Sequence, residues 1–200
     1  MLNLNNVQQQ EAPTEFSLIP AGTVCRAVMV LKMGDMEIPE FGNGMWFKQS
    51  QSSKAKWMEL EFTVIGGEFD RRKFWDRIFV DGDKMNDNGV PMAKEIGLST
   101  LRKIIDSAHG LNPTDMSETA QQRRNINGVN DLNAMEICAK VGIKKGSNGY
   151  SDQNKLMVAL TPADREYIGA NQAAPVQTPS ATVPNAAPAQ NGAAPSWANR

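Results

Sequence analysis

The sequence contains a single histidine, His109, and only two cysteines, Cys25 and Cys138, which stand far apart without a CxxC spacing. A Ser/His or Cys/His catalytic pair would have to use His109, which ends an amphipathic stretch and carries no motif around it. A zinc site would have too few ligands. This inventory predicts a protein that is not an enzyme, with no metal and no cofactor, whose two thiols are reduced and buried.

Long apolar runs and an excess of one charge are also missing. No run of about 18 apolar residues occurs, and the first residues lack the cationic start of a secretion signal, so we expect a cytoplasmic protein without a membrane span. The formal net charge is −1, from 21 basic and 22 acidic side chains. A nucleic-acid site would therefore have to come from local clustering of cations.

Composition divides the chain into three segments. Residues 1–14 are rich in Asn and Gln, which predicts a flexible arm. Residues 169–200 are dominated by Ala, Pro and Gln and carry one charged side chain. They cannot bury enough apolar surface to offset the entropy of ordering, which predicts a disordered tail. One folded domain over residues 15–168 remains.

Hydrophobic periodicity predicts five strands and one helix. The strands are expected over residues 24–32, 57–64, 73–80, 134–141 and 155–160, and the helix over 98–108 with Ser99 as its N-cap. Residues 92–96 are a candidate earlier turn of that helix, and residues 115–130 have no clear assignment. Three strands, a helix and two strands is the element order of a mainly β fold, a five-stranded Greek-key barrel of the OB type. One helix is too few for a doubly wound parallel sheet.

Basic and aromatic side chains are interleaved in the segments with which an OB-type barrel binds nucleic acid. Strands two and three and the loops before strand two and before strand five lie together in that fold. Aromatic rings stack on unpaired bases while cations follow the phosphates, which predicts largely sequence-independent binding of single-stranded DNA. The candidate residues are Trp46, Phe47, Lys48, Lys54, Lys56 and Trp57 in the first loop and second strand, Arg71, Arg72, Lys73, Trp75 and Arg77 at the third strand, and Lys144, Lys145 and Tyr150 in the last loop.

The aromatic residues of this hairpin would also fit a barrel core. Either face of the third strand can be the buried one, because Phe74 and Ile78 compete with Trp75 and Phe79 for the core and Asp76 lies between them. The sequence leaves this choice open.

Two other classes of function also fit these residues. Exposed aromatic side chains commonly anchor protein partners, so a non-enzymatic adaptor that docks a protein is the second hypothesis. The third is an enzyme that acts on DNA with a metal held by Glu59 and Glu61. Alternation along the strand already explains these two carboxylates as a solvent-facing row.

Three stretches carry a resemblance to a known family. They are residues 16–23 (FSLIPAGT), residues 59–77 (ELEFTVIGGEFDRRKFWDR) and the pair Ile96-Gly97 with the helix after it. Over roughly residues 15–160 the chain resembles a bacteriophage family of single-stranded DNA-binding-like proteins, whose members commonly have no assigned function. The resemblance implies an OB-fold and a role in phage DNA replication or recombination inside the infected bacterial host.

The resemblance also implies where DNA and partner proteins would bind. It places Arg72, Lys73, Trp75 and Arg77 on or beside the DNA-binding sheet. The tail is similar to that of bacterial single-stranded DNA-binding proteins, whose acidic, aromatic tip recruits replication and repair partners. This chain keeps Trp197 near its end but has no acidic residue there, so a phage partner, a host partner or none fits equally. The oligomeric state and the choice of DNA over RNA stay open.

Overall fold

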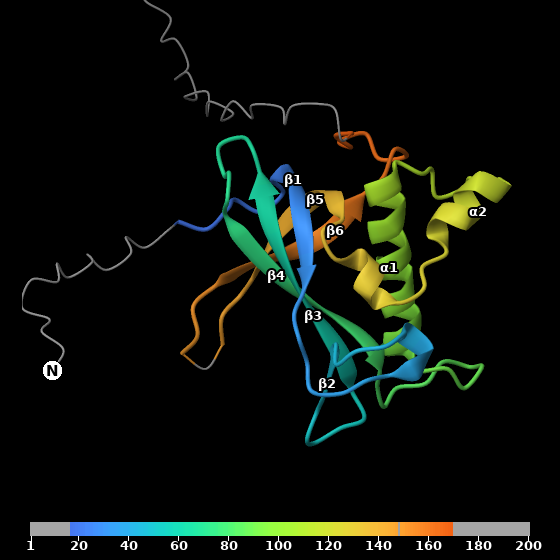
Figure 1. The fold of residues 1–200 in the computed structure, drawn as a ribbon. Coiled ribbons are helices and arrows are strands. Elements are labelled where there is room, and N and C mark those ends of the chain that lie inside the picture. The colour runs from blue at the N-terminus through green and yellow to red at the C-terminus, as the bar shows by residue number, and fades with distance from the viewer. Residues whose placement is uncertain (1–16, 148, 170–200) are drawn as a thin grey trace, which may run out of the picture.

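The structure is a computed structural model that describes residues 17–147 and 149–169 (Figure 1). The predicted arm over residues 1–14, and the tail from residue 170 with Trp197, lie outside the described residues. The strands are β1 (Val24–Leu31), β2 (Phe47–Gln49), β3 (Lys56–Ile65), β4 (Lys73–Asp81), β5 (Glu136–Lys144) and β6 (Gln153–Leu160). The helices are α1 (Met92–His109) and α2 (Glu118–Arg124), with short 3-10 helices η1 (Pro39–Phe41) and η2 (Val129–Leu132).

Five strands close into a barrel in the order β1-β5-β6-β4-β3, with β3 pairing back to β1. Neighbouring strands are antiparallel except β4 and β6, which are parallel. The short β2 pairs with the start of β3, and β1 pairs with the rest of β3. In Figure 1, α1 packs on one side of this barrel, and the loop that joins β5 and β6 lies on the side away from α1. This confirms the predicted mainly β, OB-type barrel with a helix between the third and fourth barrel strands.

Alternation along β3 and β4 decides what faces the core. Along β3, Leu60 and Phe62 are buried while the residues between them are half-buried on the outside. Along β4, Phe74 and Ile78 are buried, so Trp75 and its alternate neighbours point outward. The rings of Phe62 and Phe74 stack inside the barrel, with centroids 4.9 Å apart. Barrel closure therefore decides that the face of β4 with Phe74 and Ile78 is the buried one.

Helix α1 begins earlier than its apolar spacing predicts. It starts at Met92 after Pro91, so Ser99 lies inside the helix and the prediction that Ser99 is the N-cap was wrong. Gly97, a poor helix former, falls in its second turn. A Cβ atom at this position would lie 2.0 Å from the carbonyl oxygen of Phe79, so only glycine lets the helix approach β4 this closely. Packing against the sheet thus carries the helix through a residue that local propensity disfavours.

The segment without a sequence assignment also contains a helix. Ser117 caps α2 by accepting a hydrogen bond from the Ala120 amide at 3.3 Å. At the other end of α2, Arg124 donates from Nε to Oδ1 of the buried Asp106 at 2.6 Å. The expected strand from residue 134 begins instead at Glu136, because Ala134 has a left-handed φ of 62° that a strand cannot include.

Candidate functional site

The outer surface of the β3–β4 hairpin, here called the β3–β4 face, collects residues from both strands. Alternate residues of a strand point to the same side, so each outward residue of β3 meets one of β4. The cross-strand partners on this face are Trp57 with Phe79, Glu59 with Arg77, Glu61 with Trp75 and Thr63 with Lys73.

Three aromatic rings lie on this face with different exposure. Trp75 is 47% exposed and Phe79 is 40% exposed. Trp57 is half-buried and packs against Phe79, with ring centroids 5.8 Å apart and planes tilted by 48°. The guanidinium carbon of Arg77 lies 5.4 Å from the Trp57 ring centroid, a cation–π arrangement. Trp75 therefore offers the most open ring.

Glu61 orients the open ring of Trp75. Its carboxylate accepts hydrogen bonds from Lys73 Nζ at 2.7 Å, from the indole Nε1 of Trp75 at 3.1 Å and from Lys32 Nζ at 3.3 Å. The hydrogen bond from Lys73 contributes most to holding the pKa of Glu61 down, to about 2. An ionised Glu61 thus fixes the polar edge of the indole and ties the end of β1 to the hairpin.

Glu59 has the same role at the neighbouring cross-strand pair of the hairpin. It accepts from Lys48 Nζ at 2.8 Å, from Arg77 Nε at 3.1 Å and from Trp57 Nε1 at 3.4 Å. Burial raises the pKa of Glu59, but these hydrogen bonds and cations outweigh it and leave the pKa below its ordinary value. Glu59 and Glu61 share the outward face, as alternation predicts, and each is the centre of a hydrogen-bonded cluster.

The long first loop contributes less to this face than its composition predicts. Lys48 and Lys56 reach the hairpin, Lys48 through Glu59 and Lys56 through an ion pair with Asp81 at 2.8 Å. Lys54 is exposed in the loop just before β3. Trp46 is half-buried against the core, and its indole Nε1 donates to the Asn43 carbonyl at 3.1 Å.

Phe47 is a correction to the candidate set. Its side chain is fully buried at 0% exposure and packs beside Phe41, with ring centroids 5.2 Å apart. The sequence predicts an accessible ring because the residue lies in a loop between glycines and shows no periodicity. The loop instead forms β2, which pairs with β3 and turns Phe47 into the core opposite Met58. A ring without exposed surface cannot stack on a base.

The last loop lies at the tip of the β5–β6 hairpin. Tyr150 is 77% exposed, and Lys145 forms an ion pair with Asp152 at 2.7 Å. Lys144, at the end of β5, lies closer to the β3–β4 face.

The two arginines of the β3–β4 turn lie at the far end of the hairpin. Arg71 is exposed in a left-handed conformation, with its nearest acidic partner Asp70 at 3.6 Å. Arg72 donates a hydrogen bond to the Ser17 carbonyl. They would extend the β3–β4 face along the strand direction.

A groove connects the β3–β4 face with β6. It has a volume of about 580 Å³, and its walls include Trp75, Arg77 and Phe79 from β4, with Lys144 and Lys155 from the β5–β6 hairpin. The backbone of Trp75 is paired with that of Lys155 across the parallel junction of β4 and β6. Aromatic and cationic side chains predicted from separate segments thus line one depression.

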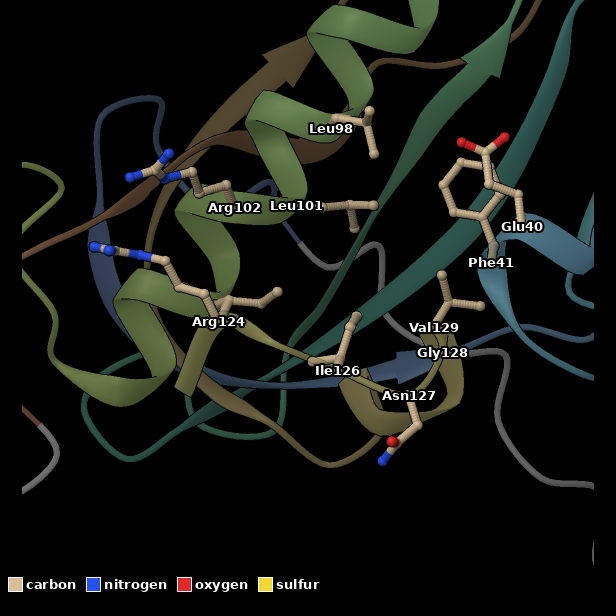
Figure 2. Close-up of a pocket in the computed structure, with 11 residues that line it drawn as sticks. Glu40, Phe41, Leu98, Leu101, Arg102, Arg124, Ile126, Asn127, Gly128 and Val129 are labelled. Atoms are coloured by element: carbon tan, nitrogen blue, oxygen red, sulfur yellow. The ribbon is translucent and has the colours of Figure 1, made fainter. Parts of the chain in front are cut away.

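A second hollow, of about 390 Å³, lies between α1, the loop after α2 and η1 (Figure 2). Its floor is apolar and includes Leu101 and Val129. Arg102 and Arg124 stand at one side, and both pair with Asp106, at 3.8 and 2.6 Å. Arg124 also donates to the Asn112 carbonyl at 2.9 Å. These arginines are thus engaged in holding α2 to α1.

Groups suited to other chemistry are few in the described part of the chain. Residues 17–147 and 149–169 contain no cluster of three or more His, Cys, Asp or Glu side chains that could hold a metal ion. Cys25 and Cys138 are both buried, and burial raises the pKa of Cys25 to about 12. Within the same ranges no helix is long and apolar enough to cross a bilayer.

Comparison with known proteins adds no family to this geometry. No protein-family model matches the chain, and no curated protein matches it significantly.

Proposed function

We propose that this protein binds single-stranded DNA, without catalysis and largely without regard to sequence, through the β3–β4 face and the adjoining groove. The observation that carries the proposal is Trp75. Its ring is nearly half exposed, Glu61 fixes its indole edge, and its groove also contains Arg77, Lys144 and Lys155. Unpaired bases stack on such rings for about 1–3 kcal/mol each, whereas bases in a duplex are already stacked and cannot.

The ion pairs of this face suit a sequence-tolerant interaction. Four cations, Lys32, Lys48, Lys73 and Arg77, share the two carboxylates Glu59 and Glu61, which leaves a local excess of positive charge. Phosphates can take up the remaining hydrogen-bonding capacity of these cations while the carboxylates keep the rings in place. Affinity should fall with salt, with a slope of about −0.7 per phosphate neutralised.

The biological setting follows from the resemblance over residues 59–77. We infer a role in phage DNA replication or recombination in the cytoplasm of the infected host. Recruitment of phage or host replication proteins would fall to the tail.

The test is a titration of the full chain with labelled oligo-dT of about 30 nucleotides and with a matching duplex, at low and high salt. We expect tight, salt-sensitive binding and tryptophan quenching with the single strand only. Trp75→Ala should weaken that binding about tenfold or more. Met116→Ala removes an exposed apolar side chain away from this face and should leave the affinity unchanged.

The same face also supports the adaptor function, because its cations are already paired and its rings would anchor a protein. No binding of either oligonucleotide at low salt would overturn the DNA proposal. A stoichiometric protein partner captured without nucleic acid, and lost in Trp75→Ala, would then support the adaptor.

A further inference from the structure

Asp76 is a carboxylate on the core-facing side of β4. Its neighbours on that side are Phe74 and Ile78, which are 0% and 3% exposed, and its partner across the hairpin is Leu60 at 1%. An apolar side chain would satisfy this position, since burying a charge without full hydrogen bonding is unfavourable. The aspartate therefore departs from the pattern of its own strand.

The barrel is closed beside this residue by its shortest strand pairing. β4 and β6 are joined by a single pairing, Trp75 with Lys155, whereas β3 and β4 pair along most of their length. Asp76 directly follows that pairing and lines the groove next to the β3–β4 face. It also lines another groove, of about 440 Å³, between α1 and β6, here called the α1–β6 groove. Asp76 thus belongs to the lining of both grooves.

One oxygen of this carboxylate is left for a ligand. Oδ1 accepts a hydrogen bond from the Arg77 amide at 2.9 Å, and no donor among the described residues bonds to Oδ2. Burial raises the pKa of Asp76, and the hydrogen bond from the Arg77 amide and the nearby Lys155 and Lys144 offset this rise incompletely. Neither lysine forms an ion pair with Asp76 within 4 Å in the described ranges of the chain. Oδ2 of this half-buried residue is therefore an acceptor without a protein donor among the described residues.

The residues around Asp76 indicate which kind of ligand would donate a hydrogen bond to its Oδ2. The same groove contains the open ring of Trp75 and the exposed edge of Phe79, which suit a flat base, and Lys144 and Lys155, which suit a phosphate. A carboxylate in such a site accepts hydrogen bonds from an amino group, as Asp and Glu do from cytosine N4. Uracil and thymine present a carbonyl oxygen at that ring position, which a carboxylate repels.

We propose that Asp76 is a specificity-determining residue that accepts a hydrogen bond from the exocyclic amino group of a base stacked in the groove beside Trp75. This rests on the proposed function and refines it. Binding is sequence-tolerant over most of the strand, and one position favours cytosine over uracil or thymine. The α1–β6 groove would let the DNA strand continue past Asp76 toward α1.

The test compares labelled oligo-dC and oligo-dU of equal length, about 30 nucleotides, at pH 8 and one salt concentration. This pair differs at the ring position that Asp76 would read, without the methyl group of thymine. Wild type should bind oligo-dC about tenfold more tightly, the gain expected of one charged hydrogen bond. Asp76→Asn should invert the preference, because its amide N–H donates to uracil O4 and repels the cytosine amino group.

Two further variants separate recognition from charge and from folding. Asp87→Asn removes one negative charge on the exposed loop before α1 and should keep the cytosine preference of wild type. Asp76→Val fills the core position with an apolar side chain and should remove the cytosine preference without inverting it. This variant keeps the test informative if Asp76→Asn folds poorly. Thermal unfolding of each variant shows that the comparison is between folded proteins.

The outcomes distinguish the two proposals. If wild type binds neither oligonucleotide, the proposed function itself fails. If wild type binds both with tryptophan quenching but with equal affinity, DNA binding stands and the role of Asp76 is overturned. A cytosine preference that persists unchanged in both Asp76 variants also overturns it, because the preference would then arise elsewhere.

Discussion

The two sides of strand β4 show how one strand serves stability and recognition separately. Its outward side carries Trp75 and Arg77, whose polar atoms are bonded to Glu61 and Glu59. Its inward side is apolar except for Asp76, which has an incomplete set of hydrogen bonds. On the outward side each carboxylate thus has several protein donors, whereas the half-buried Asp76 has one, the Arg77 amide. The carboxylate that keeps a free acceptor oxygen is the better indicator of a ligand.

Glu61 and Asp76 make the same contrast between two carboxylates. Cations and an indole donate to Glu61 and hold its pKa near 2, whereas burial raises the pKa of Asp76. The ionised form is stabilised in the first case and penalised in the second. Substitutions on the two sides of the sheet should accordingly differ in size and in sign.

The largest effect is expected from Phe74→Ala on the inward side. Phe74 is fully buried and stacks on Phe62, so its truncation leaves a cavity and should lower the free energy of unfolding by about 3–5 kcal/mol. Urea denaturation measures this loss. Trp75→Ala, the next residue but on the outward side, should change the free energy of unfolding by about 1 kcal/mol or less. Equal losses in both variants would erase the distinction between the two sides.

The next effect is expected where α1 approaches the edge of β4. Gly97→Ala places a Cβ atom 2.0 Å from the Phe79 carbonyl oxygen, so the helix must move away from the strand. We expect a loss of about 2 kcal/mol in thermal or urea unfolding, despite the higher helix propensity of alanine. Ser99→Ala, an exposed position on the same helix, is the control and should cost less than about 0.5 kcal/mol. A more stable Gly97→Ala protein would show that the helix is not held by this contact.

Asp76→Val should act in the opposite direction and stabilise the fold by about 1 kcal/mol at neutral pH. The folded-state pKa of Asp76 is raised, so its ionised form opposes folding above that pKa. As pH falls through the raised pKa toward 3.8, the carboxyl gains its proton in the folded state and the advantage of valine should shrink. Melting temperatures from pH 7 to pH 4 follow this change. A valine variant less stable than wild type at every pH would mean that Asp76 supports the core.

The smallest effect is expected from Glu61→Gln on the outward side. The lowered pKa of Glu61 means that its ionised form favours folding above the unfolded value of 4.5, and this contribution is lost as pH falls toward 2. The amide should therefore lower stability by about 1 kcal/mol or less at pH 7, with the difference vanishing in acid. The effect of Glu61→Gln on DNA binding is more informative than its effect on stability. Removing a negative charge should tighten binding if only charge matters, and weaken it if Glu61 holds the Trp75 ring.

Local patterns in the sequence were sufficient to predict much of this fold. Alternation along β3 is enough to assign Leu60 and Phe62 to the core, and the spacing of Leu101 and Ile105 is enough to assign the buried side of α1; all four are buried. These signals are local because the period of a strand or helix follows from its backbone geometry alone. The order of elements then restricted the topology to a small Greek-key barrel.

The sequence could not predict features that depend on distant pairing. Phe47 reads as a loop residue until β2 pairs with β3, and α2 depends on the contact of Arg124 with Asp106. The clusters around Glu59 and Glu61 draw donors from β2, from β4 and from Lys32, the residue after β1. No short window of sequence contains both partners of such contacts.

The amino-acid sequence by itself determined the five barrel strands, the main helix and the presence of a basic and aromatic set of side chains. Tertiary structure alone decided which side of β4 is buried. Each side carries two large apolar side chains, Phe74 and Ile78 on one and Trp75 and Phe79 on the other, and barrel closure and the approach of α1 choose between them. It also decided that Asp76 lies beside the shortest strand pairing of the barrel, since β4 and β6 are joined at one residue pair. A strand's period fixes two sides, but which one meets the core depends on what packs against it.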